Sequence, residues 1–245
     1  MTSIALSIWP LSVSHSRLDA LRGLLSTEER SRAQRFRSPE AKRDYVVAHG
    51  VARELLSFEC ECAPGDIKFI SARGGKPEIE APSGAPRFSL AHGGQLVALA
   101  ACRLGPLGVD IEPIAPVNDD LVCSAFSKRE AAALGNVPAA LKPTAFLRGW
   151  TLKEAYLKGT GEGLPGGLES LELSIQSDAM VAPRALRGSA KAILDWQFFS
   201  FEPAPGFVGA VAVYARRRPA KLLMRTIDPE VSPAWRAREV CKVWN

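Results

Sequence analysis

Apolar and polar residues recur along the chain with two different periods. Short stretches that alternate, or that are apolar throughout, predict strands near residues 4–9, 67–71, 87–91, 95–103, 107–112, 168–175, 192–201 and 207–214. Stretches with apolar residues every three or four positions predict helices near residues 18–25, 26–57, 127–134 and 138–158. Helices interleaved with mostly antiparallel strands indicate an α+β fold.

These predicted elements fall into two stretches of similar plan. The apolar run 95–103, a Leu-Gly-Pro turn over 104–106 and the run 107–112 predict a hairpin that joins them. We therefore expect an N-terminal half over residues 1–106, a C-terminal half over 107–220 and a C-terminal tail over 221–245. In the tail, segment 234–244 fits either a short amphipathic helix packed on the body or a contact for a partner.

A glycine-rich segment over 159–167 follows the last predicted helix. It lacks the Gly-x-x-x-x-Gly-Lys pattern of a phosphate-binding loop, and a helix C-terminus carries the wrong end of the helix dipole for anions. We expect this segment to end the helix and connect it to the next strand.

Composition narrows the class of protein. The chain has 245 residues, 47% of them hydrophobic, which is enough for one large or two small domains with a well-packed core. Its net charge of +5 suits an acidic partner protein, a polyphosphate ligand or nucleic acid. Arg216-Arg-Arg218 is the only tight basic run, and no zinc-finger or RNA-binding signature is present, so nucleic acid is not the expected partner.

Cysteine usage and the lack of long apolar segments indicate the compartment. Five cysteines, at positions 60, 62, 102, 123 and 241, make an odd number, and with three histidines they complete no plausible zinc set. Free thiols in a reducing compartment are the simplest interpretation. No signal-peptide pattern and no apolar segment of about 20 residues occurs, so we expect a cytoplasmic protein without membrane contact.

Three acidic residues lie where folding alone would not place them. In Gly108-Val-Asp-Ile-Glu-Pro113, the two-residue period of a strand puts Asp110 and Glu112 on one face. In Trp150-Thr-Leu-Lys-Glu-Ala-Tyr-Leu-Lys158, Glu154 lies on the helical stripe that should face the core. A buried carboxylate without a partner is costly, so Glu154 needs one.

Two partners are available to Glu154, and both can act together. Lys158 follows one helical turn later, and a divalent cation could be shared with Asp110 and Glu112. Three oxygen ligands without a nearby histidine or thiolate favour Mg²⁺. The alternative is that Asp110 and Glu112 form a solvated strand end and that Glu154 and Lys158 form an ordinary helix pair worth roughly 0.2–0.5 kcal/mol.

The two acidic motifs together resemble the signature of the phosphopantetheinyl transferases, in particular the larger monomeric type that serves peptide and polyketide synthetases. The resemblance implies transfer of the phosphopantetheine arm of coenzyme A to a serine of an acyl or peptidyl carrier protein. It implies that Asp110, Glu112 and Glu154 bind Mg²⁺, that Glu154 or a metal-bound water accepts the serine proton, and that Lys158 neutralises charge on the phosphate. It further implies a monomer whose two pseudo-symmetric halves enclose the coenzyme in a cleft between them.

Other stretches extend the resemblance over roughly residues 28–164. Gly75-Lys-Pro77 resembles a family turn, and Phe88-Ser-Leu-Ala-His-Gly-Gly94 resembles a family segment in which serines stand at the positions of Ala91 and Gly93. Arg32-Ala-Gln-Arg-Phe36 and the stretch 43–53 resemble its basic helical region. The coenzyme contacts that the resemblance implies are Arg43, Arg53, Lys76, His92 and Lys153.

A non-catalytic module that binds coenzyme A or a carrier protein on the same fold remains the alternative function. The absence of the two serines around His92 favours it, and the presence of all three acids opposes it.

Overall fold

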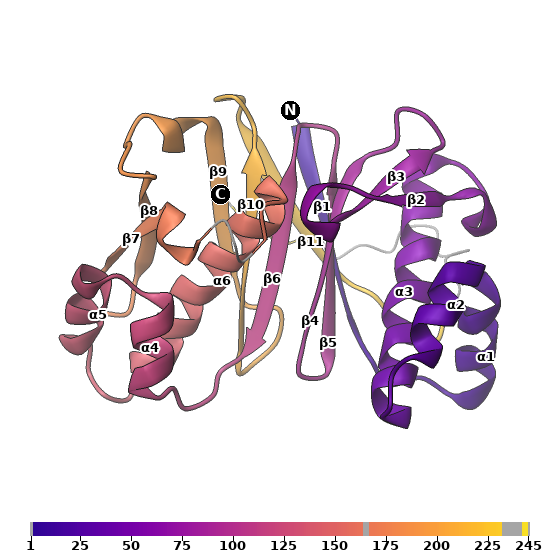
Figure 1. Ribbon diagram of the computed structural model, residues 1–245, viewed down its shortest axis with the longest axis horizontal. Coiled ribbons are helices and arrows are strands. Elements are labelled where there is room, and N and C mark those ends of the chain that lie inside the picture. The colour runs from indigo at the N-terminus through magenta and orange to yellow at the C-terminus, as the bar shows by residue number, and fades with distance from the viewer. Residues whose placement is uncertain (1, 164–166, 232–241, 245) are drawn as a thin grey trace.

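Two sheets lie next to each other at the centre of the computed structural model, which describes residues 2–163, 167–231 and 242–244 (Figure 1). The first sheet has the order β12-β11-β1-β5-β4 and the second the order β6-β10-β9. The first comprises β1 (Thr2–Pro10), β4 (Arg87–Gly93), β5 (Leu96–Cys102), β11 (Ala220–Thr226) and β12 (Lys242–Trp244). The second comprises β6 (Leu107–Pro113), β9 (Trp196–Phe201) and β10 (Phe207–Tyr214). All the described strand pairs are antiparallel except β1–β11.

Helices and two small sheets cover the outer sides of the central pair (Figure 1). Beside the first sheet lie α1 (His15–Leu24), α2 (Thr27–Gln34), α3 (Pro39–Cys60), β2 (Lys68–Ser71) and β3 (Pro77–Ala81). Beside the second lie α4 (Asp119–Ala125), α5 (Lys128–Gly135), α6 (Lys142–Thr160), β7 (Leu171–Ile175) and β8 (Val181–Leu186). This arrangement confirms the α+β class.

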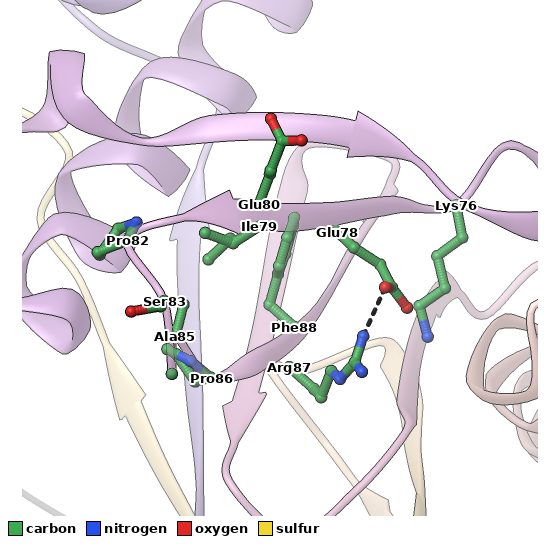
Figure 2. Close-up of a pocket in the computed structure, with 11 residues that line it drawn as sticks. Lys76, Glu78, Ile79, Glu80, Pro82, Ser83, Ala85, Pro86, Arg87 and Phe88 are labelled. Carbon is green, nitrogen blue, oxygen red and sulfur yellow. Dashed lines mark ion pairs between the residues drawn. The ribbon is translucent and has the colours of Figure 1, made fainter.

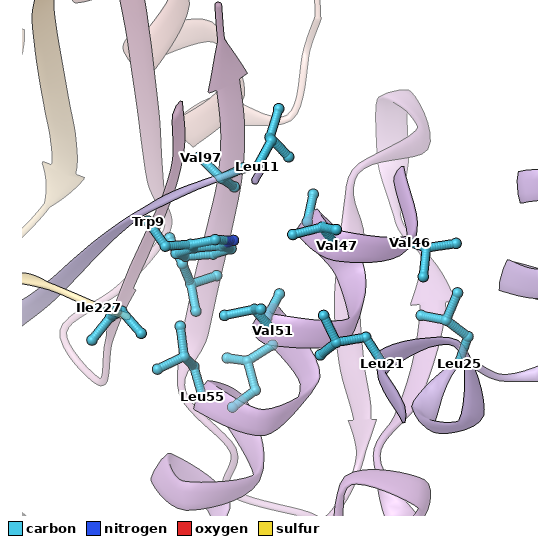
Figure 3. Packing of buried hydrophobic residues seen from close by; sticks show 14 of the residues in the cluster. Trp9, Leu11, Leu21, Leu25, Val46, Val47, Val51, Leu55, Val97 and Ile227 are labelled. Carbon is cyan, nitrogen blue, oxygen red and sulfur yellow. The ribbon is translucent and has the colours of Figure 1, made fainter. Parts of the chain in front are cut away.

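The two halves share one plan. In each, a strand is followed by helices, a two-stranded sheet and a hairpin, and the strand order β1-β5-β4 matches β6-β10-β9. Each half buries its own apolar cluster on its helical side, as Figure 3 shows for Trp9 of β1 beside Val47 and Val51 of α3. A third cluster, with Ile4 from one sheet and Val109 from the other, lies between the sheets and joins the halves.

One predicted helix and one predicted strand pairing differ from the structure. The predicted helix 26–57 is two helices, because Ser38 caps α3 and Pro39 occupies its first turn, and the residue before a proline disfavours helix. The predicted hairpin 95–112 is wrong: in the described structure both edges of β5 are paired, with β1 and β4, and β6 pairs with β10. The segment 104–106 therefore carries the chain from one sheet to the other.

The expected C-terminal tail is partly built into the first sheet, where β11 pairs with β1 and β12 with β11. Of segment 234–244, residues 234–241 lie outside the described residues, and Lys242–Trp244 is a strand. Gly161, with φ 71°, ends α6 as predicted for the glycine-rich segment. The four cysteines that the structure describes are free thiols, as predicted. None of the described helices is long and apolar enough to cross a membrane.

Candidate active site

Strand β6 presents its acidic residues to helix α6. Leu107, Val109 and Ile111 are fully buried in the cluster between the sheets. Because side chains alternate along a strand, Asp110 and Glu112 lie on the opposite face, toward α6. Asp110 is only 4% exposed, whereas Glu112 is half-buried.

Helix α6 carries three polar side chains that are spaced four residues apart and face β6. Trp150, Glu154 and Lys158 therefore lie on one stripe. The Lys158 Nζ lies 2.6 Å from the Asp110 Oδ1, and the Trp150 side chain lies close enough to Glu112 to offset part of the rise that burial causes in the pKa of that carboxyl. Polar side chains of the strand and of the helix therefore contact one another where β6 and α6 cross.

A glycine allows this close approach of β6 and α6. A Cβ on Gly108 would lie 2.0 Å from the Ala155 carbonyl oxygen and 2.5 Å from the Gly159 amide nitrogen, far inside van der Waals contact. Any larger residue at position 108 would push α6 away from β6. The glycine of the Gly-Val-Asp-Ile-Glu motif is therefore part of the geometry that brings Asp110 and Lys158 together.

The carboxyl groups at this crossing share a low-dielectric environment. Burial raises the pKa of Asp110 to about 6, although the Lys158 ammonium opposes the shift. Burial also raises the pKa of Glu112 and of Glu154. Mutual repulsion adds to the pKa increase, since Glu112 raises the pKa of Asp110, Asp110 raises that of Glu154, and Glu154 raises that of Glu112. A local positive charge would relieve this repulsion.

The site has the chemistry of a hard-cation site without a preassembled cluster. Among the described residues, no group of three or more His, Cys, Asp or Glu side chains is arranged to hold a metal ion. One oxygen nevertheless lacks a partner: the Asp110 Oδ2 is buried and has no hydrogen-bond partner among the described residues. A buried, unpaired carboxylate oxygen is costly, and oxygen-only donors fit Mg²⁺.

His92 lies on β4, on the face of the first sheet that points away from β6 and its acidic residues. Side chains alternate along β4, so His92 shares a face with Phe88 and Leu90, which pack toward α3 and line a pocket of about 250 Å³. Its neighbours Ala91 and Gly93 face β6 instead. A Cβ on Gly93 would lie 2.3 Å from the Ile111 carbonyl oxygen, so the spacing of β4 and β6 in this structure leaves no room for a serine side chain at position 93.

Residues of the basic helical region line the pocket of about 250 Å³. It is lined by residues from α2, α3, β2, β3 and β4: Glu28, Glu29, Arg32, Tyr45, His49, Ala52, Phe69, Ile70, Ser71, Gly75, Pro77, Phe88 and Leu90. Tyr45 and His49 stack with ring centroids 3.9 Å apart, and the Arg32 guanidinium lies 6.0 Å from the Tyr45 ring. Tyr45 and His49 were not among the predicted site residues, although their i,i+4 spacing on a helix is a signal that they share a face.

Two of the predicted arginine contacts already have protein partners. Arg43 is half-buried and donates a hydrogen bond to the Val13 carbonyl oxygen at 2.8 Å. Arg53 is 2% exposed, and its Nε lies 2.6 Å from the Glu29 Oε2. The structure therefore does not bring Arg53 to a ligand-accessible surface, because its guanidinium is buried beneath the pocket.

Lysines 76 and 153 are also engaged by the protein. The Lys76 Nζ donates to the Leu107 carbonyl oxygen at 2.7 Å and lies 3.4 Å from the Gly159 carbonyl oxygen. Lys153 is 1% exposed, and its Nζ lies 3.0 Å from the Glu130 Oε2. Successive helical residues differ by about 100° in direction, so Lys153 points away from the stripe of Glu154 and into the core. The structure does not place Lys153 at the acidic site.

Comparison with known proteins identifies the family. Residues 106–213, which contain β6 and α6, match the model of the 4'-phosphopantetheinyl transferase superfamily. The 4'-phosphopantetheinyl transferase HetI of Nostoc sp. is 34% identical over 209 residues, covering 83% of this chain and 84% of the relative. The 4'-phosphopantetheinyl transferases psf-1 of Bacillus pumilus and Sfp of Bacillus subtilis are 29% and 28% identical, covering 83% and 64% of this chain and 87% and 70% of the relatives. With the paired acidic motifs placed against each other by β6 and α6, this chain belongs to the 4'-phosphopantetheinyl transferase superfamily.

Proposed function

We propose that this protein transfers the 4'-phosphopantetheine group of coenzyme A to a serine hydroxyl of an apo acyl or peptidyl carrier protein and so converts the carrier to its holo form. The observation that carries the proposal is the crossing of β6 and α6, where Asp110, Glu112, Glu154 and Lys158 meet in a chain of this family. The crossing combines carboxylates with one ammonium, as phosphoryl-type transfer needs.

The reaction requires one bond to form and one to break at phosphorus. The serine oxygen bonds to the phosphate that carries pantetheine, and the bond from that phosphorus to the bridging oxygen breaks, releasing adenosine 3',5'-bisphosphate. The serine loses its proton, and Glu154 is the proposed acceptor. Burial and Asp110 raise the pKa of Glu154, which makes it a stronger base than an exposed glutamate.

Lys158 and the metal supply positive charge. The Lys158 ammonium is one-third exposed while it contacts Asp110, so it can also reach a phosphate oxygen at the mouth of the site. We propose Asp110, Glu112 and Glu154 as Mg²⁺ ligands, with the unpartnered Asp110 Oδ2 as the oxygen most in need of one. A bound Mg²⁺ would neutralise charge on the pyrophosphate.

We place the nucleotide end of coenzyme A in the pocket lined by Arg32, Tyr45 and His49, which offers aromatic faces and a guanidinium. His92, exposed on the pocket side of β4, and Arg43 are the proposed further phosphate contacts. Arg53 supports the pocket from below through Glu29.

The proposed partner is an acidic carrier protein, in keeping with the net charge of +5. The duplicated plan of the two halves supports a monomer, since one chain supplies both sides of the fold. A cytoplasmic location is proposed on the free thiols of the described cysteines.

The test is intact-mass spectrometry of purified apo carrier proteins after incubation with this protein, coenzyme A and Mg²⁺. We expect a gain of one phosphopantetheine that disappears when EDTA is added. Glu154→Gln should abolish the gain while coenzyme A binding is weakened only in part. The matched control is Glu169→Gln, which alters an exposed glutamate beyond α6 and should transfer at the wild-type rate.

Two results would count against the proposal. No gain of mass on any of several fatty-acid, polyketide and peptide carriers, with coenzyme A still bound, would favour the non-catalytic binding module. Normal turnover by Glu154→Gln would show that the site is assigned incorrectly. The missing serine at position 93 gives the binding module little support, because the close contact of β4 with β6 leaves no room there for a side chain.

A further inference from the structure

Two backbone groups on the outer edge of β6 are hydrogen-bonded to side chains of the N-terminal half. The Tyr214 amide donates to the Pro106 carbonyl oxygen, and antiparallel pairing alternates, so the backbone groups of Leu107 and Val109 point away from β10. The Val109 amide donates to the Ser89 Oγ at 3.1 Å, and the Lys76 Nζ donates to the Leu107 carbonyl oxygen at 2.7 Å.

The same lysine reaches the C-terminal end of α6. The last carbonyl groups of a helix have no partner within the helix, and they carry the negative end of its dipole. The Lys76 Nζ lies 3.4 Å from one of these, the Gly159 carbonyl oxygen. One ammonium group therefore contacts both the strand and the helix that form the active site.

Backbone contacts hold Lys76 at this position. The turn Arg73–Gly75 precedes it, and Gly74 has φ 70°. A Cβ on Gly74 would lie 2.2 Å from the Gly161 carbonyl oxygen, so the turn packs directly on the end of α6. Lys76 stands at one end of a pocket of about 320 Å³ between β3 and β4, in which Glu78 pairs with Arg87 (Figure 2).

We propose that Lys76 is a positioning residue for the transferase site. Its ammonium ties the start of β6 to the end of α6, and so fixes the separation at which Asp110 and Lys158 meet. Lys158 is adjacent in sequence to Gly159, and Asp110 follows Leu107 by three residues, so movement at either carbonyl shifts the ion pair directly. The inference rests on the proposed function, and it differs from a role in binding a phosphate of the coenzyme.

The experiment compares Lys76→Met, which keeps the aliphatic stem but removes the ammonium, with wild-type protein. For a positioning role, kcat should fall at least 10-fold while KM for coenzyme A changes less than 3-fold. Lys76→Arg, which retains donors at this position, should recover most of kcat. Lys68→Met is the matched control, because Lys68 is an exposed lysine on the neighbouring strand β2 and its loss should change neither constant.

Hydrogen exchange without any ligand supplies a readout that is independent of activity. Amides of residues 107–112 and 153–160 should exchange faster in Lys76→Met than in wild-type protein, and the Lys68→Met control should leave them unchanged. Should Lys76→Met fail to fold, Lys76→Gln, which keeps a donor of shorter reach, takes its place with the same expectations.

The opposite pattern would overturn the proposal. A raised KM for coenzyme A with unchanged kcat, together with unaltered exchange in β6 and α6, would make Lys76 a coenzyme contact. If wild-type protein transfers nothing, the proposed function fails, and the exchange measurement alone still decides whether Lys76 ties the strand to the helix.

Discussion

Replacing Lys153 by Met tests whether this lysine serves the coenzyme or the core. Its Nζ lies 3.0 Å from the Glu130 Oε2 and 2.9 Å from the Leu168 carbonyl oxygen, with both charged side chains at most 2% exposed. The Glu130 carboxylate also accepts hydrogen bonds from the backbone amides of Ser127 at 2.8 Å and Leu173 at 2.7 Å. Lys153 thus belongs to a network that links α5, α6 and β7.

The expected loss of stability is large. Removing one partner of a buried ion pair leaves the other charge without compensation, which costs roughly 3–5 kcal/mol. In a chain of this size, each kcal/mol lowers the melting temperature by about 2–4 °C, so Lys153→Met should melt about 6–20 °C below wild type. Adding Glu130→Gln removes the uncompensated charge and keeps an acceptor for one of the two amides, so the double variant should recover part of the loss.

The assay is urea denaturation for the free energy of unfolding, together with KM for coenzyme A measured well below the melting temperature. The control is Lys128→Met, which alters an exposed lysine of α5 and should change stability by less than about 0.5 kcal/mol. Unchanged stability of Lys153→Met with a raised KM for coenzyme A would refute the structural role. That outcome would return Lys153 to the set of coenzyme contacts.

Three further predictions concern the crossing of β6 and α6 and the pocket beside it. Gly108→Ala should lower the transfer rate roughly 100-fold in the carrier assay, because its Cβ would lie 2.0 Å from a backbone oxygen of α6 and the catalytic groups must separate by about 1 Å. The control is Gly135→Ala, since Gly135 has open space around it. A near-normal rate for Gly108→Ala would contradict the packing argument. Burial lowers the pKa of Lys76 from 10.5 to about 8, so between these pH values the unfolded chain holds a proton on Lys76 that the folded protein has lost. The free energy of unfolding of the wild type should therefore rise relative to that of Lys76→Met by up to about 3 kcal/mol as the pH increases from 8 to 10.5. The free energy of unfolding of both proteins is measured by urea denaturation at several pH values. A difference between them that stays constant from pH 8 to 10.5 would disprove that shift. Tyr45→Ala should raise KM for coenzyme A about 10-fold with kcat within 2-fold, since it removes a stacking face of the pocket; an unaltered KM would place the nucleotide elsewhere.

Local periodicity was sufficient for β6 and α6, the elements that carry the acids, and for the acidic pairing, but it did not predict α4, β3, β8 or β11. Alternation along 107–112 placed Asp110 and Glu112 on one face, and the four-residue spacing placed Lys158 beside Glu154, because both periods follow from backbone geometry alone. The same geometry separates Lys153 from Glu154 by about 100°, so its departure from the site was readable from the helix. The burial of Lys153 against Glu130 could not be predicted from the helix, because the two residues are 23 positions apart in the sequence and come together only when the chain packs.

By itself, then, the sequence determined the α+β class and the strand and helix that carry the acids, because these depend on local spacing, and the resemblance of the two acidic motifs indicated the family of the chain. Tertiary structure alone decided which edges pair. Adjacent apolar runs predicted a hairpin at 95–112, yet the edges of β5 were already filled by β1 and β4, and β6 took β10 instead. It also decided the roles of the basic residues, since an arginine or lysine suits a phosphate, a carboxylate or a carbonyl equally well, and only the groups that folding brings within hydrogen-bonding distance select among them.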